Sequence, residues 1–319
     1  MTIGDIEQLF DRVQQEIRKA VVGQTELVEG VLFALFCEGN VLIEGPPGLG
    51  KTLLVNSLSK VLDSQFGRVQ FTPDLMPSDI TGHSVFDMRE KEFTFNRGPI
   101  FTNLLLADEI NRAPAKTQAA LLEAMQERQV TVDGKTYPLP RPFITIATQN
   151  PLEQEGTYPL PEAQLDRFLF KLLVDYPTDA EEQDILKLYA NGRDSHNLST
   201  FGLESVMTAK MVRSVQEVVR GILIEPQVIT YISAIVQKTR AWNTIEIGAS
   251  PRAGVGLLIA SRAAAACRGR DFVIPDDVKD LAPSVLRHRI RLQPDVEVEG
   301  VSEEEVIRDL LDSVEAPKR

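Results

Sequence analysis

The residues best suited to chemistry begin with a glycine-rich segment early in the chain. The pattern G-x-x-x-x-G-K-[ST] is matched at 45–52, directly after the apolar run 41–43. Its glycines let backbone N–H groups close around phosphates, its lysine neutralises the outer oxygens, and its threonine can ligate Mg²⁺. The alternative is a plain Gly/Pro turn between a strand and a helix. We predict that a nucleoside triphosphate is bound by Gly45, Pro47, Gly48, Leu49, Gly50, Lys51 and Thr52.

A second constellation is a pair of acids at the end of an apolar run. The run 104–107 is followed by Asp108 and Glu109, and ligands of open α/β sheets bind at the carboxyl ends of strands. We expect Asp108 to reach Mg²⁺ and Glu109 to position and deprotonate the water that attacks the terminal phosphoryl group. Taken alone, the pair would be read as a polar strand end before a helix. The glycine-rich segment reverses that preference.

An amide follows another apolar run. The segment 143–149 reads as a buried strand that ends at Asn150, just before Pro151. An uncharged amide can donate to a phosphate oxygen or a water without titrating. We therefore expect Asn150 to orient the attacking water, the alternative being a simple Asn-Pro turn.

Two arginines stand where they could reach phosphate. Arg167 lies near the end of a predicted short helix that leads into the run 168–174, and a guanidinium supplied to a neighbouring subunit stabilises phosphoryl transfer. An ion pair with Asp166 is the simpler alternative. Arg252 follows a serine cap and Pro251, where a cation opposes the helix dipole by roughly a few tenths of a kcal/mol. That placement favours contact with an anion such as the nucleotide of the first domain of this chain, although a solvated first-turn arginine is also possible.

Hydrophobic patterning divides the chain at about residue 177. Short apolar runs at 41–43, 104–107, 143–147 and 168–174 alternate with helical segments such as 51–62, as in a largely parallel sheet. After Pro177 the periodicity becomes helical, with Thr178 as a cap. We predict an α/β domain at 1–177 and a helical domain at 178–319, with helices at 180–189, 209–219, 227–239, 252–267, 275–287 and 303–311.

Composition excludes several classes of function. The 319 residues, 43% of them hydrophobic, suffice for two cores, and the net charge of -12 opposes general attraction to nucleic acid.

Cys37 and Cys267 are predicted to be free buried thiols, as suits a reducing cytoplasm. No zinc site is expected from three scattered histidines. No apolar run reaches about eighteen residues, so we expect a cytoplasmic protein without a membrane span.

Four further segments carry a resemblance to a known family. They are FTPDLMPSDITG at 71–82, LADEINRAP at 106–114, TQAALLEAMQE at 117–127 and GASPRA at 248–253. Together with the glycine-rich segment and in this order, they resemble the MoxR family of AAA+ ATPases, over nearly the whole chain from 22–24 to 285–289. Ala115 departs from the family pattern, in which a second proline often follows Pro114, but no catalytic position is affected.

The resemblance implies a P-loop NTPase (AAA+) parallel-sheet domain with a smaller all-α lid, and hydrolysis of ATP to ADP and phosphate with Mg²⁺. It makes Asp108 and Glu109 Walker B residues, Asn150 sensor 1, Arg167 the arginine finger and Arg252 sensor 2, and it adds Val22 and Gly23 to the adenine pocket. It also implies an insert within 71–101, a hairpin at 130–139 and a homo-oligomeric, hexameric ring. Its protein clients would be remodelled or activated, often together with von Willebrand factor A domain partners.

Three other functions remain open at this stage. A nucleic-acid motor or loader on the same fold is opposed by the low basicity, and stimulation of hydrolysis by nucleic acid would reveal it. A motor subunit of a metal chelatase would need a porphyrin-binding partner. A nucleotide-binding scaffold without hydrolysis is disfavoured because Asp108, Glu109, Asn150, Arg167 and Arg252 all have suitable side chains.

Overall fold

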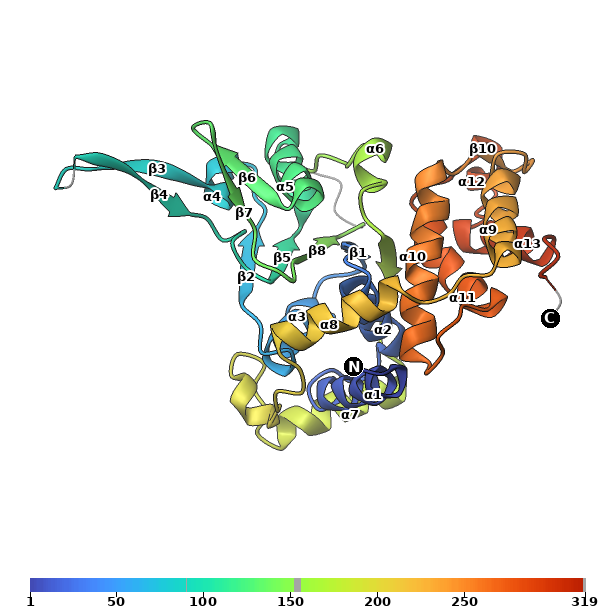
Figure 1. The fold of residues 1–319 in the computed structure, drawn as a ribbon, viewed down its shortest axis with the longest axis horizontal. Coiled ribbons are helices and arrows are strands. Elements are labelled where there is room, and N and C mark those ends of the chain that lie inside the picture. The colour runs from blue at the N-terminus through green and yellow to red at the C-terminus, as the bar shows by residue number, and fades with distance from the viewer. Residues whose placement is uncertain (90, 152–155, 318–319) are drawn as a thin grey trace.

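A parallel sheet forms the centre of the molecule. The computed structural model describes residues 1–89, 91–151 and 156–317 (Figure 1). Within these residues, five parallel strands lie in the order β2 (Phe66–Gln70), β5 (Leu104–Asp108), β8 (Ile144–Gln149), β1 (Val41–Glu44) and β9 (Phe170–Leu173). The four apolar runs are confirmed as strands. The edge strand β2 was not predicted, because Gly67, Arg68 and Gln70 interrupt its apolar pattern.

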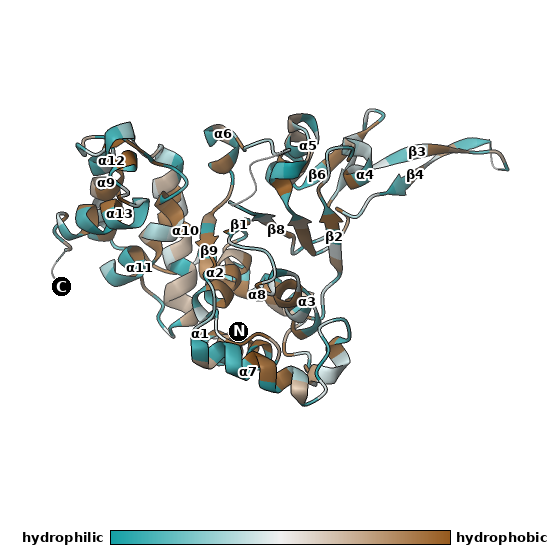
Figure 2. Cartoon of the chain, turned by 180° about the vertical axis from the view of Figure 1, so that it is seen from behind, coloured by the Kyte–Doolittle hydropathy of each residue, from teal (hydrophilic) through white to brown (hydrophobic). Residues whose placement is uncertain are grey.

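The two faces of the sheet pack against different layers. Alternate strand residues point to opposite faces, so Ile43 and Leu106 join the helices of one core while Leu42 and Leu105 join a second core. The first layer contains α1 (Ile3–Arg18), α2 (Thr25–Phe36) and α3 (Lys51–Val61), and the second contains α5 (Ala115–Glu127). Most of α2 is buried, and Figure 2 shows it as apolar over nearly its whole length. The sheet is therefore covered on both faces, as parallel sheets require.

Among the described residues, two β-hairpins and three short helices complete the sheet region. The hairpin predicted at 130–139 is confirmed as β6 (Gln129–Val132) and β7 (Lys135–Pro138), with Asp133 and Gly134 both at positive φ in its turn. A longer hairpin of β3 (Gly82–Asp87) and β4 (Glu92–Arg97) projects away from the body (Figure 1). The short helices are α4 (Pro77–Thr81), η1 (Ile110–Arg112) and α6 (Glu162–Leu165).

The remainder of the chain is helical, as expected. The six predicted helices appear as α7 (Asp179–Ala190), α8 (Ala209–Arg220), α9 (Pro226–Thr239), α10 (Pro251–Cys267), α11 (Pro275–Leu286) and α13 (Glu303–Asp312). Shorter elements between them are η2 (Leu198–Phe201), β10 (Ile245–Ile247), β11 (Arg291–Leu292) and α12 (Pro294–Val298). Thr178 forms a capping box with Glu181, and Ser250 accepts from the backbone N–H of Arg252. Both caps fix helix starts at the predicted positions.

The first long helix after 190 packs back onto the sheet region. Helix α8 contacts both α2 and α10, and Gln216 donates from Nε2 to the buried carbonyl of Leu35 at 2.7 Å. Apolar residues of α1, α2, α8 and α10 belong to one continuous core. Helices α9, α10, α11 and α13 pack against one another at the far end of the molecule. The division at 177/178 stays a prediction.

A buried carboxylate near the start of α11 is the clearest test of this packing. Asp277 is fully buried and accepts hydrogen bonds from Arg268, Arg270 and the backbone N–H of Ile274. We expect Asp277→Ala to lower the free energy of unfolding by about 3 kcal/mol, because the partly buried Arg270 loses its counter-ion and Arg268 is left with the half-exposed Asp280. Urea denaturation would measure this. Asp184→Ala, which removes an exposed ion pair with Lys187, should cost below about 1 kcal/mol, and equal losses would contradict the prediction.

Candidate functional site

The glycine-rich segment forms the turn between β1 and α3. Gly48 and Gly50 have φ values of 83° and 75°, a left-handed conformation that side chains other than glycine rarely adopt. Gly45 is required for a different reason, because a Cβ atom there would lie 2.4 Å from the carbonyl oxygen of Val174. The turn therefore holds the start of α3, with its free backbone N–H groups, at the carboxyl edge of the sheet.

One cavity brings the predicted phosphate-binding and acidic residues together. It has a volume of about 570 Å³ and lies at the carboxyl ends of β1, β5 and β8. Its lining includes the predicted residues Pro47, Gly48, Leu49, Gly50, Lys51, Thr52, Asp108, Glu109 and Asn150. These residues come from three separate strand ends, so their convergence is a property of the fold rather than of the local sequence.

Lys51 lies between the turn and the acids. Its Nζ donates to the carbonyl oxygen of Gly45 at 2.6 Å. Burial lowers the pKa of Lys51, while Asp108, Glu109 and Glu44 act in the opposite direction by stabilising the ammonium. The lysine therefore stands in a partly dehydrated site in which a phosphate would be a strong partner.

Asp108 and Glu109 are held by a network of side chains. Thr148 donates from its hydroxyl to Asp108 at 2.6 Å and accepts from the backbone N–H of Glu109 at 2.9 Å. Arg68 binds the other oxygen of Asp108 at 2.7 Å, and Gln70 donates to the Glu109 carboxylate at 2.7 Å. The acids are thus fixed from two neighbouring strands, β8 and β2.

Glu109 also has an unusual backbone. Its φ and ψ of 57° and 51° are left-handed, a conformation that costs a residue with a side chain about 1 to 2 kcal/mol. Glu109 shares this conformation with six other non-glycine residues of the described chain, and here it turns the chain from β5 into η1.

Thr148, Arg68 and Gln70 were not predicted as site residues. The strand register places Gln70 beside Asp108, but β2 itself was not recognised. Thr148 lies near the carboxyl end of β8, where it pairs with Ile43 of β1. Its position next to Asp108 depends on β8 lying beside β5. A signal existed in the polar end of the run 143–149, but its use required the strand order.

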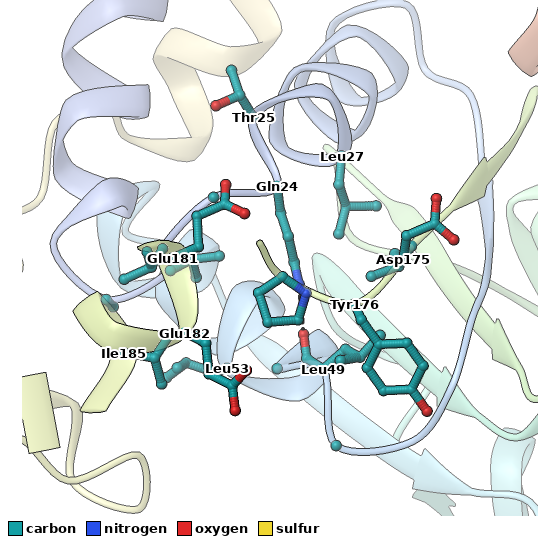
Figure 3. Close-up of a pocket in the computed structure, with 18 of the residues that line it drawn as sticks. Gln24, Thr25, Leu27, Leu49, Leu53, Asp175, Tyr176, Glu181, Glu182 and Ile185 are labelled. Carbon is teal, nitrogen blue, oxygen red and sulfur yellow. Dashed lines mark hydrogen bonds between the residues drawn. The ribbon is translucent and has the colours of Figure 1, made fainter. Parts of the chain in front are cut away.

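A second cavity, of about 710 Å³, adjoins the first. The predicted residues Val22 and Gly23 line it, together with side chains from α7 and the segment after β9 (Figure 3). A Cβ atom at Gly23 would lie 2.4 Å from the Glu181 carboxylate, so a larger residue would displace the Glu181 side chain. Both cavities share Gly48, Leu49, Gly50, Leu53 and Tyr189 in their linings. Together they suit a ligand with a flat, partly apolar end and a phosphate end.

The donor set also fits Mg²⁺. Thr52 and Asp108 line the same cavity and supply oxygen atoms, the ligand type that Mg²⁺ prefers. Among the described residues there is no group of three or more His, Cys, Asp or Glu side chains that could hold a metal. A Mg²⁺ ion at this site would therefore take its other ligands from water and phosphate, as is usual for this ion.

The two predicted arginines lie elsewhere. Neither Arg167 nor Arg252 lines either cavity. Arg252, with 52% of its side chain exposed, is 3.6 Å from Asp166, the residue before Arg167. Arg167 follows α6 and Arg252 lies in the first turn of α10, and these two elements lie on the same side of the molecule in Figure 1. The structure thus brings the arginines near each other, outside the cavities that would hold this chain's own nucleotide.

The sequence also predicted free thiols at both cysteines and the absence of a membrane-spanning helix. Cys37 and Cys267 are both free, with Cys267 buried and Cys37 partly buried, and burial raises the pKa of Cys37 to about 12. In the described part of the chain, every helix is too short or too polar to cross a membrane.

The fold and the site define an AAA+ ATPase, and comparisons with known proteins agree. Residues 40–170 match the family model "ATPase family associated with various cellular activities (AAA)", and 237–310 match an AAA lid domain. A crystal structure of a protein from Cytophaga hutchinsonii, named a candidate ATPase, superposes with a TM-score of 0.91 at 39% identity, covering 99% of this chain and 97% of that one.

Similar sequences show which family of AAA+ ATPases the chain belongs to. Chaperone MoxR1 of Mycobacterium tuberculosis is 43% identical over 97% of this chain and 82% of its own length. Protein MoxR of Methylorubrum extorquens is 30% identical, covering 96% and 94%. The uncharacterized protein YeaC of Bacillus subtilis is 45% identical, covering 98% and 96%. The chain belongs to the MoxR family of AAA+ ATPases.

The Thr148 hydroxyl gives a test of the site geometry. We expect Thr148→Val to weaken Mg²⁺-dependent nucleotide binding about tenfold, because Asp108 and the Glu109 N–H each lose a hydrogen-bond partner. Binding without Mg²⁺ should change little. Titration of a fluorescent ATP analogue with and without Mg²⁺ would measure both, with the exposed Thr131→Val as control. Equal affinities for wild type and Thr148→Val in Mg²⁺ would contradict this role.

Proposed function

We propose that this protein hydrolyses ATP to ADP and phosphate with Mg²⁺ as cofactor. The observation that carries the proposal is the single cavity lined by Lys51, Thr52, Asp108, Glu109 and Asn150. Val22 and Gly23 line the adjoining cavity in which the adenine would bind. Membership in an AAA+ family gives the proposal independent support.

Each residue of the cavity has a task in this reaction. Lys51 and the backbone N–H groups of the glycine-rich turn bind and orient the phosphates. Thr52 and Asp108 would hold Mg²⁺, which supplies charge neutralisation for phosphoryl transfer. Glu109 orients a water and accepts its proton, and Asn150 fixes the same water through its amide. The bonds from Gln70 and Thr148 hold Glu109 in place before the water is activated.

We further propose that Arg167 and Arg252 complete the site of a neighbouring subunit. Their absence from the cavity linings supports this arrangement, because arginines that lie outside their own chain's pocket can reach the pocket of a neighbouring chain. Such head-to-tail contacts generate closed rings when the rotation closes. The family resemblance sets the expected ring at six subunits, and the arginines would stabilise charge on the transferred phosphoryl group.

The purpose of hydrolysis in this proposal is to remodel or activate protein clients, with von Willebrand factor A domain partners. A relative that covers most of this chain is named a chaperone. The projecting hairpin of β3 and β4 carries exposed apolar side chains, including Phe93 at 72% exposure, and surfaces of this kind mark protein contacts. The free thiols fit a cytoplasmic location.

Removal of the Glu109 charge tests the hydrolytic role. Glu109→Gln should lower turnover at least a hundredfold while ATP affinity stays within about threefold, because an amide keeps the shape of the side chain but cannot accept the water's proton. Phosphate release and equilibrium binding measure the two quantities. Glu299→Gln, at an exposed position, should behave as wild type. Wild-type turnover in Glu109→Gln would remove Glu109 from this role.

Mixed assemblies test whether sites are shared. We expect Arg167→Ala and Lys51→Ala to be inactive separately and to regain part of the activity when mixed, because an intact pocket then meets an intact arginine. The mixture of Glu109→Gln with Lys51→Ala is the matched control. Both of its defects lie in the same pocket, so it should stay inactive. Absence of recovery in the Arg167 mixture would argue against a site built by two subunits.

A further inference from the structure

Arg289 is a buried arginine for which the proposed reaction has no assigned task. Only 3% of its side chain is exposed. Its Nε donates to the Asp166 carboxylate at 2.7 Å, and its two terminal nitrogens donate to the carbonyl oxygens of Phe168 at 2.6 Å and Leu169 at 3.1 Å. It also reaches the carbonyl of Val285 in α11. One guanidinium group thus binds successive carbonyls of the segment that begins at Asp166.

Adjacent residues extend this contact. His288 is buried and its Nε2 lies 3.0 Å from the carbonyl oxygen of Phe168, while Arg287 donates to the carbonyl oxygen of Lys171 at 3.1 Å. Residues 287–289 therefore bind the backbone of 168–171 along its length. Residues 287–289 follow α11, a helix of the lid region, and residues 168–171 run into β9. The contact therefore joins the end of α11 to the edge strand of the sheet, beside Arg167.

Asp166 connects this buried contact to the exposed arginine of α10. One of its oxygens accepts from Arg289, and the other accepts from the Ser250 hydroxyl at 3.2 Å and lies 3.6 Å from Arg252. The Arg289 interaction is buried and has several hydrogen bonds, so breaking it would leave an uncompensated charge. The Arg252 interaction is long and half exposed, and it costs little to break. The ion pair of Asp166 with Arg289 is therefore the strong one, and its ion pair with Arg252 is weak and easily exchanged.

We propose that Asp166 and Arg289 are positioning residues that hold Arg167 and Arg252 ready for the nucleotide of a neighbouring subunit. This inference rests on the proposed function. Arg289 binds the residues on both sides of Arg167, Asp166 and Phe168, so the position of Arg167 is fixed relative to α11. Asp166 keeps Arg252 at the same surface until a phosphate, which binds arginine more strongly than a long exposed ion pair does, takes its place.

The test uses mixed assemblies of the full-length chain. Asp166→Asn keeps the size of the side chain and removes its charge, and Arg289→Met removes the guanidinium group. For both variants we expect kcat to fall about tenfold with KM for ATP within twofold, because their own nucleotide pockets are intact. Mixing either variant with Lys51→Ala should restore part of the activity, as the Lys51→Ala subunits carry a correctly held Arg167. A purely structural defect would not be corrected in this way.

The outcomes separate this inference from the proposed function. Arg291→Ala is the matched control, because Arg291 is exposed and pairs with Glu162 and Glu246 instead; it should keep wild-type kcat. Wild-type kcat in Asp166→Asn or Arg289→Met would overturn the positioning role, and so would lost kcat that mixing does not restore while the Arg167→Ala mixture recovers. No hydrolysis by the wild type, or no recovery in the Arg167→Ala mixture, would instead overturn the proposed function or its shared site.

Discussion

The whole account depends on the opposition of Lys51 and Asp108 across one cavity. A parallel sheet places the carboxyl ends of β1, β8 and β5 at one edge, so the lysine that follows β1 and the carboxylates that follow β5, two strands away, line the same cavity. The Lys51 ammonium is partly buried in this cavity. Burial lowers the pKa of Lys51, and the nearby carboxylates oppose that shift. A triphosphate with a divalent cation is the ligand that such an arrangement of charges matches best.

Much of the fold and part of the site could be predicted from local patterns. The glycine-rich turn, the apolar runs and the capped helices are local signals, and the structure contains them at the expected positions. Thr148 and Arg68 could not be assigned in this way, because each reaches Asp108 only through the order of neighbouring strands. The edge strand β2 lacked an apolar pattern since much of it is partly exposed.

The position of Arg252 illustrates the same limit. A cap and a first-turn arginine were visible in the sequence, but the direction in which the arginine points depends on how the lid docks. Arg289 and its neighbours contribute to that docking by binding backbone carbonyls far away in the sequence, together with the contacts of α10 with α1, α2 and α8. The strand order therefore builds the pocket, and the lid contact places Arg252 beside Asp166. Under the proposed function, the arginines would make the pocket of one subunit depend on the next.

The most direct measurement is a crystal structure of the protein with Mg²⁺ and a non-hydrolysable ATP analogue. The account predicts the terminal phosphate within hydrogen-bond distance of Lys51, a Mg²⁺ ion between Thr52 and the Asp108 side of the cavity, and the base beside Val22 and Gly23. A nucleotide bound elsewhere, or one whose phosphates contact neither Lys51 nor the metal held at Asp108, would contradict it.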